Sequence, residues 1–421
     1  MTDRMRAVVL SGLMAGLAGG LSGCTTHEAT DTGNESVVSA STVPAGDLVT
    51  GQAELGFALY AKLTEDAGAP ENLFISPVSI STAFGLLHAG ANGTTADEIA
   101  AVMRFPVDVD AQMRGFAESV SDDREGSVFA LANAVFAAEA LPISESYRAT
   151  VEEAYGGKVE RVPFATAPRQ AEATINAWVS ENTRGLIPKV YEGTVQDDWI
   201  LSLVNTAYLK ADWENQFDAS LTSPQEFAAP DGPVEVEMMR DRRNTPFAEG
   251  RGWKAVKLPY LNGTMSATFV LPTRGGLATL ERGMDAQWLA EVEGALNASK
   301  AELPYVDLEI PKVDVAGDYE LTGVLQAMDL VEIFGSPDLD RIYGQEIRND
   351  QVSSVIHKTR LKVDEKGTEA AAVTAIGIHT TSARIEPEAM EFHADQPFLL
   401  LLRHEETGAV LFMGRIADPT G

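Results

Sequence analysis

The sequence predicts an α+β fold in which helices pack on large, mostly antiparallel sheets. Apolar residues recur at helical spacing mainly in the first part of the globular region, and strand-like runs follow mainly in the later part. No β-α-β cadence of a parallel sheet and no internal repeat appears, and no domain linker follows residue 50. The 421 residues, 45% of them hydrophobic, allow one large domain or two ordinary ones with a sizeable core.

The first 50 residues have the composition of an export segment followed by a linker. Two arginines precede an apolar, glycine-rich run at residues 7–21, which is too short to predict a membrane span. The order LSGC ending at Cys24 resembles a bacterial lipoprotein signal with lipid on the cysteine thiol; an ordinary secretory signal is the alternative. We therefore expect a signal peptide, a flexible lipid-anchored tether and a globular domain at residues 1–23, 24–50 and 51–421.

This interpretation places the protein outside the cytoplasm, anchored to the cell envelope on its periplasmic or outer side, without spanning the membrane. The chain has 62 acidic and 32 basic residues, a formal charge of -30, and no basic patch, so nucleic acid is not expected as a partner. A single cysteine excludes a disulfide within the chain. The histidines do not have the spacing of metal ligands, so neither a metal nor another cofactor is expected. We also expect the protein to be a monomer.

The early part of the domain is predicted to be helical. Leucines at helical spacing predict an amphipathic helix over residues 51–64. Pro77 suits the first turn of a second helix, with Ser76 as its N-cap. The apolar run at residues 80–87 is nearly continuous, so this second helix should be buried, and Thr94 begins another helix.

The later part reads mainly as strands. Residues 129–138 are nearly all apolar, which predicts a strand buried on both faces, with a buried helix as the alternative. Apolar residues at helical spacing over residues 175–190 predict a helix, which should end near Gly185. The dipeptide Asn262-Gly263 between apolar runs predicts a hairpin. Further strands are expected at residues 202–212, 303–315, 352–363, 398–402 and 410–413.

The segment from Val363 to Phe398 combines an uncharged stretch with a polar, turn-rich one. Its first half, Gly367 to Ile378, consists mostly of small and β-branched residues. Read at period two, one face carries no charge and comprises Thr368, Ala370, Ala372, Thr374, Ile376 and Ile378. This pattern fits a strand that could be added to a sheet, whereas the alanine content also favours a helix and the segment can equally be an exposed loop.

Several segments, in order, resemble segments of the serpin family: FISPVSISTAF, NAWVSENTRGLI, LVNTAYLKADW, KLPY, VIHKTRLKVDEKGTEAAA, ADQPFLLLLR and VLFMGRI. The resemblance extends from about residue 51 to the C-terminus. It implies the serpin fold with an exposed reactive-centre loop, and a suicide inhibitor of serine proteases rather than an enzyme. In this family the cleaved loop inserts into the main sheet and traps the acyl-enzyme. A non-inhibitory, lipid-anchored serpin that acts as a binding module is the alternative.

The resemblance also implies roles for individual residues. Glu365 begins the loop with Lys312 as its partner, and Trp213 lies at the breach where the sheet opens. The hinge where insertion starts comprises Glu365, Gly367, Thr368, Ala370, Ala371 and Ala372. The polar cluster under the centre of the sheet, the shutter, comprises Ser76, Ser79, Asn205 and His357. No metal role is needed for His357.

The spacing from Glu365 that is usual in serpins places the reactive bond at Thr381-Ser382, and Arg384 is the competing position. Thr381 would attract a protease that prefers small side chains, of elastase or subtilisin type, whereas Arg384 would attract a trypsin-like protease. Thr368, Ala370 and Ala372 are uncharged and none of them is a proline, which favours insertion of the hinge. Neither G-x-S-x-G nor S-x-x-K occurs in the chain, so the sequence offers no serine-hydrolase motif.

Overall fold

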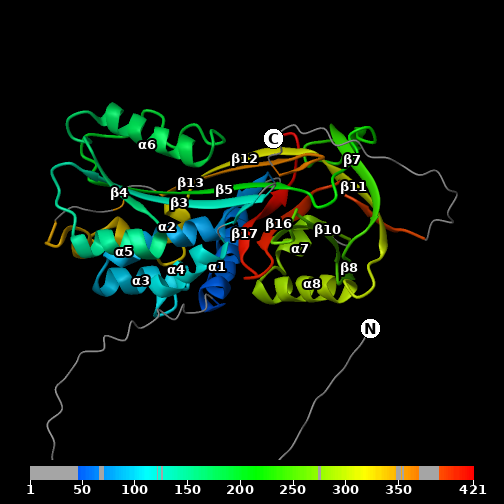
Figure 1. Ribbon diagram of the computed structural model, residues 1–421, viewed down its shortest axis with the longest axis horizontal. Coiled ribbons are helices and arrows are strands. Elements are labelled where there is room, and N and C mark those ends of the chain that lie inside the picture. Colours follow the sequence, from blue (N-terminus) through cyan, green and yellow to red (C-terminus); the bar gives the residue numbers. More distant parts are fainter. Residues whose placement is uncertain are drawn as a thin grey trace, which may run out of the picture. The chain divides into compact units, whose positions relative to one another are not determined.

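The computed structural model contains three β-sheets with helices packed around them, so the predicted α+β fold is confirmed (Figure 1). The structure describes residues 46–65, 71–120, 122–124, 127–273, 276–347, 352, 355–368 and 388–421. Within these residues no helix is both long and apolar enough to cross a membrane.

The largest sheet, called the main sheet below, has seven strands. Their order is β12-β13-β14-β5-β3-β2, and β4 pairs with β3 off this path. Every pairing is antiparallel except that of β3 with β4, which is parallel. The strands are β2 (Asp122–Arg124), β3 (Ser127–Ala138), β4 (Lys158–Val162), β5 (Leu201–Asp212), β12 (Val313–Glu320), β13 (Ile356–Val363) and β14 (Gly367–Thr368).

The other two sheets have six and four strands. The six-stranded sheet is antiparallel throughout and contains β1 (Leu73–Ile75), β17 (Val410–Ile416), β16 (Phe398–His404), β10 (Met265–Pro272), β9 (Trp253–Pro259) and β8 (Phe247–Gly250), in that order. The predicted hairpins at Asn262-Gly263 and before Val410 are both present in it. The four-stranded sheet contains β15 (Met390–His393), β11 (Tyr305–Pro311), β7 (Val234–Asn244) and β6 (Ser223–Phe227).

Helices cover both faces of the main sheet. In Figure 1, α6 lies over one face, and α2 and α5 lie against the other. The buried helix α2 begins as predicted, with Pro77 in its first turn and the Ser76 side chain accepting a hydrogen bond from the Ser79 N–H. The helices are α1 (Gly46–Glu65), α2 (Pro77–Gly90), α3 (Gly93–Met103), α4 (Val109–Val120), α5 (Glu145–Tyr155), α6 (Pro168–Asn182), α7 (Leu277–Glu281), α8 (Ala286–Ser299), α9 (Thr322–Gln326) and α10 (Asp340–Tyr343), with a 3-10 turn at Glu332–Phe334.

Several predicted boundaries need correction. The single strand expected at residues 303–315 is two strands in different sheets, because the chain leaves the four-stranded sheet after Pro311 and enters the main sheet at Val313. Period-two burial is the same in both sheets, so the pattern does not reveal the crossing. The first helix begins at Gly46, inside the stretch expected to be tether, because Leu48 is buried in the core.

Three further differences concern burial and helix ends. Residues 129–138 do form a strand, yet only its second half is buried on both faces, since the side chains of residues 130–132 are half-buried. The helix expected to end near Gly185 ends at Asn182. The strand expected over residues 352–363 is described only from Ile356 onward.

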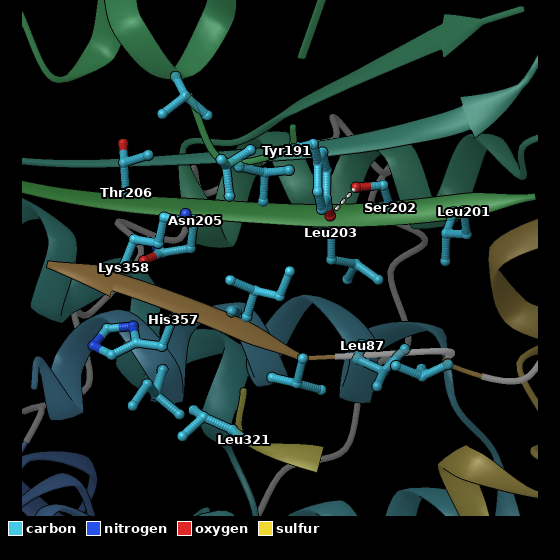
Figure 2. A pocket seen from close by; sticks show the side chains of 18 of the residues that line it. Leu87, Tyr191, Leu201, Ser202, Leu203, Asn205, Thr206, Leu321, His357 and Lys358 are labelled. Atoms are coloured by element: carbon cyan, nitrogen blue, oxygen red, sulfur yellow. Dashed lines mark hydrogen bonds between the residues drawn. The ribbon is translucent and has the colours of Figure 1, made fainter. Parts of the chain in front are cut away.

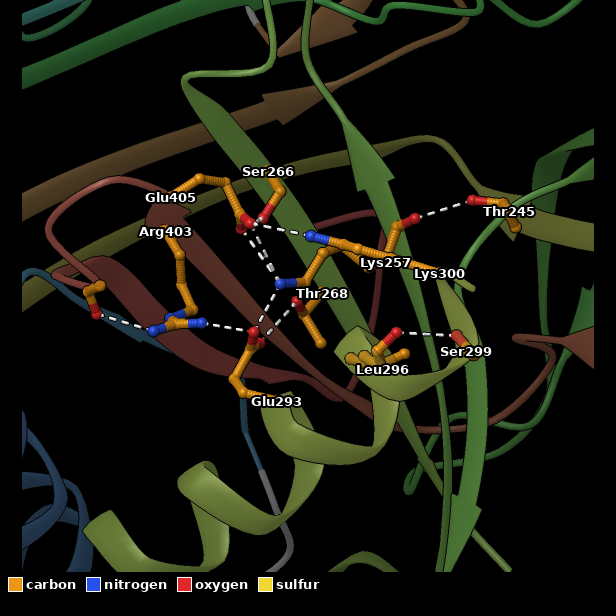
Figure 3. Close-up of polar contacts among 11 residues, drawn as sticks. Thr245, Lys257, Ser266, Thr268, Glu293, Leu296, Ser299, Lys300, Arg403 and Glu405 are labelled. Carbon is orange, nitrogen blue, oxygen red and sulfur yellow. Dashed lines mark hydrogen bonds and ion pairs between the residues drawn. The ribbon is translucent and has the colours of Figure 1, made fainter. Parts of the chain in front are cut away.

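A buried ion network ties α8 to the six-stranded sheet (Figure 3). Lys257 on β9 lies 2.5 Å from Glu293 on α8 and 3.1 Å from Glu405, and Arg403 on β16 also contacts Glu293 at 2.5 Å. The Lys257 side chain is only 3% exposed. Burial raises the pKa of Glu405, but hydrogen bonding from Ser266 and the Lys257 ammonium outweigh this and lower it. The network satisfies charges that would be costly if left unpaired at this depth.

Candidate functional site: a slot in the main sheet

The main sheet contains a slot between β5 and β13. These two strands run parallel to each other, because each pairs antiparallel with β14. At the described residues of β14, Thr368 lies between Val363 and Ala211. Beyond Thr368, the described part of the chain places no strand between β5 and β13, and a cavity of about 510 Å³ lies there (Figure 2).

Most of the residues that line the cavity are apolar, but polar groups also make up much of its wall. Leu201 and Leu203 come from β5, Leu87 from α2 and Leu321 from the segment before α9. The polar groups include Asn205, His357 and the Tyr191–Ser202 hydroxyl pair, whose oxygens are 3.0 Å apart. Strand edges without a neighbour present backbone N–H and C=O groups, which makes them a template for an added strand.

The two described residues of β14 close one end of the slot. Thr368 is 3% exposed, and its Oγ1 lies 2.5 Å from the hydroxyl of Tyr260. Trp213 stacks on the Tyr260 ring with centroids 4.5 Å apart, and its Nε1 donates to the Asp364 carbonyl at 2.9 Å. Trp213 directly follows β5, and its hydrogen bond links the end of this strand to the turn that leads into β14.

Glu365 anchors the same turn. Its carboxylate lies 3.1 Å from the Lys312 ammonium and accepts a hydrogen bond from the Thr222 hydroxyl at 2.9 Å. Burial alone raises the pKa of Glu365, but its own backbone N–H, Thr222 and Lys312 together lower it. The carboxylate therefore stays ionised, and the contact expected between Lys312 and Glu365 exists in the structure.

Gly367 occupies a position where a side chain has no room. A Cβ atom built there would lie 2.0 Å from the carbonyl oxygen of Ala211. We expect Gly367→Ala to displace β14 from the sheet and to lower the free energy of unfolding by about 1–3 kcal/mol, the usual cost of overpacking. Chemical denaturation measures this loss, with Gly294→Ala as control because nothing lies near a Cβ at that helical position. Equal stability of the two variants would contradict the close approach.

The four shutter residues, Ser76, Ser79, Asn205 and His357, lie beneath the slot. The backbone N–H of Ser76 donates to His357 Nε2 at 3.0 Å, which ties α2 to β13. The Ser79 hydroxyl donates to Asn205 Oδ1, which ties α2 to β5. The four residues expected to cluster are therefore together, and each edge of the slot is attached to the start of the same helix.

Sequence reasoning missed a further member of this network, Asn133 on β3. Its Oδ1 accepts a hydrogen bond from Asn205 Nδ2 at 2.6 Å, and its Nδ2 donates to the Tyr155 carbonyl at 2.8 Å. A single asparagine in the apolar run FALANAVFAA was the available signal, because a buried amide needs hydrogen-bond partners.

Burial lowers the pKa of His357 from 6.5 to about 4. Folding therefore favours the neutral ring, whose Nε2 can accept the Ser76 N–H. We expect the contribution of His357 to stability to be present above pH 6.5 and to fall by about 3 kcal/mol as the pH drops to 4, levelling below that. The difference between wild type and His357→Gln in denaturation across this range isolates the effect; parallel pH profiles would contradict it.

Some predicted site residues lie outside the residues that the structure describes. They are Cys24, Ala370, Ala371, Ala372, Thr381, Ser382 and Arg384. The remaining hinge, breach and shutter residues lie around one slot or beneath it.

These features define a protein whose main sheet has a slot between two parallel strands, β5 and β13, with β14 closing one end of it. A family model described as serpin (serine protease inhibitor) matches residues 50–419. The chain belongs to the serpin family, as the resemblance of its segments indicated.

Relatives and solved structures agree with this assignment. An uncharacterized serpin-like protein of Thermococcus kodakarensis is 35% identical over 367 residues, which cover 86% of this chain and 84% of the relative. The leukocyte elastase inhibitor of Xenopus laevis is 32% identical over 377 residues, covering 86% and 97%. The crystal structure of uncleaved ovalbumin matches with a TM-score of 0.78 at 28% identity, covering 89% of this chain and all of that one.

Proposed function

We propose that this serpin is a suicide inhibitor of serine proteases and not an enzyme. A target protease attacks the bait bond and forms an acyl-enzyme. The freed hinge side of the loop then enters the slot as a strand and carries the bound protease with it. The observation that carries this proposal is the position of Thr368, which already lies paired between the two edges of the slot.

The register of β14 predicts where the following residues would go. Thr368 pairs with Ala211 and Val363, and its side chain is buried. Continued in steps of two, this register would bring Thr374 between Asn205 and His357. The residues sharing its face would be Ala370, Ala372, Ile376 and Ile378, the uncharged face of the segment. These small and apolar side chains suit the apolar residues that line the cavity.

The free energy of insertion is sufficient for the proposed trapping. Roughly ten new ladder hydrogen bonds contribute about 0.5–1.5 kcal/mol each. Burial of the inward alanine, threonine and isoleucine side chains adds to this at about 25 cal/mol per Å². A total on the order of 10–20 kcal/mol would be enough to distort a catalytic site and preserve the ester.

The bait bond that we propose is Thr381-Ser382, with a protease of elastase or subtilisin type as target; Arg384 and a trypsin-like protease form the alternative. The purified protein is mixed with pancreatic elastase, subtilisin and trypsin in turn. We expect a denaturant-resistant band at the summed mass with one of the first two, and a released peptide that begins at Ser382. Cleavage by all three without any such band would favour a non-inhibitory binding module.

We further propose that the protein is exported and lipid-anchored through Cys24, with residues 24–45 as a tether. The order LSGC at residues 21–24 supports this proposal. Expression in a bacterial host with labelled palmitate should label the wild type and leave Cys24→Ser unlabelled. Equal labelling of both proteins would overturn the anchor without affecting the proposed inhibition.

A further inference from the structure

Asn133 is buried next to the slot, and the function proposed above assigns it no role. It lies on β3 directly opposite Asn205 of β5, and its side chain is 3% exposed. Space around it is restricted, because a Cβ built on Gly157 would lie 3.3 Å from the Asn133 Cβ. Both ends of its amide are engaged, the NH2 with the Tyr155 carbonyl and the oxygen with the NH2 of Asn205.

The Tyr155 carbonyl determines which way these amides point. Tyr155 is the last residue of α5, and Gly156 follows it in the left-handed conformation, so this carbonyl is one that the helix leaves without an internal partner. A carbonyl oxygen can only accept, which requires Asn133 to present its NH2 and to turn its oxygen toward Asn205.

The same logic extends one residue further. Asn205 has to present its NH2 to Asn133, and its own oxygen then faces the hydroxyl of Ser79. The carbonyl at the end of α5 therefore determines the orientation of the Asn205 amide through Asn133. Asn205 also lines the cavity, so its orientation bears on whether the slot can be entered.

We propose that Asn133 is a positioning residue for loop insertion, which holds the Asn205 amide against Ser79 and β3 at the wall of the slot. This inference rests on the proposed function and concerns the regulation of the same slot. Without an acceptor at position 133, the NH2 group of the half-buried Asn205 side chain loses its partner. The amide is then free to turn further into the cavity that it lines, where it obstructs the incoming strand. Insertion slows, and more inhibitor is cleaved and released than retained in complex.

The test combines Asn133→Ala, Asn205→Ala and the double variant with pancreatic elastase or subtilisin, whichever forms the complex. The readout is the number of inhibitor molecules consumed per protease trapped. We expect Asn133→Ala to raise this number about three- to tenfold, as the loss of one net hydrogen bond implies. In the Asn205→Ala background the same change should have almost no effect, because no amide remains to be positioned.

Asn72→Ala is the matched control. The Asn72 amide donates to the Asp418 carbonyl and accepts from the N–H groups of Ala417 and Asp418, so its removal also breaks part-buried hydrogen bonds of an asparagine. We expect the number of inhibitor molecules consumed to stay at the wild-type value. An unchanged or lower number in Asn133→Ala, or an equal rise in both backgrounds, would overturn the proposal.

A second measurement separates this inference from the proposed function. If the wild type forms no complex with any protease, the proposed function fails, and the thermal midpoints of the intact variants still test the contact. Asn133→Ala should lower the midpoint by roughly 1–4 °C in the wild-type background. In the Asn205→Ala background the decrease should be less than half as large. Additive decreases would show that Asn133 does not act through Asn205.

Discussion

Thr368→Arg is expected to abolish the covalent complex and turn the protein into a substrate that its target cleaves at full rate. Thr368 is buried between Val363 and Ala211, with its hydroxyl on Tyr260. Burial raises the pKa of Tyr260, so its phenol stays protonated and offers no negative charge to an arginine. A guanidinium at this position would have to enter the sheet unpaired, which costs several kcal/mol and delays insertion beyond deacylation.

Gel electrophoresis under denaturing conditions measures the outcome as the ratio of complex to cleaved inhibitor. Thr368→Ser is the matched control, because it keeps the hydroxyl that faces Tyr260 and adds no charge. We expect the serine variant to retain most of the complex. Full yield of complex from the arginine variant would show that insertion at β14 is not required, and the proposed mechanism would then be wrong.

Proteolytic nicking of the segment around residues 380–385 is expected to raise the thermal midpoint by roughly 10–25 °C. The range follows from an insertion free energy on the order of 10–20 kcal/mol divided by the unfolding entropy of a domain of this length. A protease that cuts there without being trapped, such as a metalloprotease, prepares the nicked protein. Scanning calorimetry at one fixed scan rate compares it with the intact protein.

The nicked Thr368→Arg variant provides the control for this experiment. Its chain is cut at the same place, yet its hinge cannot enter the sheet, so its midpoint should stay near that of the intact variant. A midpoint that does not rise in the nicked wild type would remove the basis for trapping. It would instead favour a serpin that binds partners without inserting its loop.

Local chemistry in the sequence was enough to predict several features of the site. Ser76 and Pro77 predict the start of α2, because N-capping and the fixed backbone angle of proline act over a few residues. The uncharged period-two face that begins at Thr368 follows from strand geometry alone, and the structure buries Thr368 as that face requires. The family resemblance supplied the pairing of Lys312 with Glu365, which no local pattern contains.

Other features depend on which strands become neighbours, and these only the tertiary structure decided. Periodicity reports that a residue faces a core, but not which sheet provides that core, so the break after Pro311 between two sheets could not be read from it. The role of Asn133 likewise depends on β3 pairing with β5 in the register that sets it opposite Asn205. Register and sheet membership arise from contacts between residues far apart in the chain, whereas a sequence pattern records only the demands of each segment on its immediate surroundings.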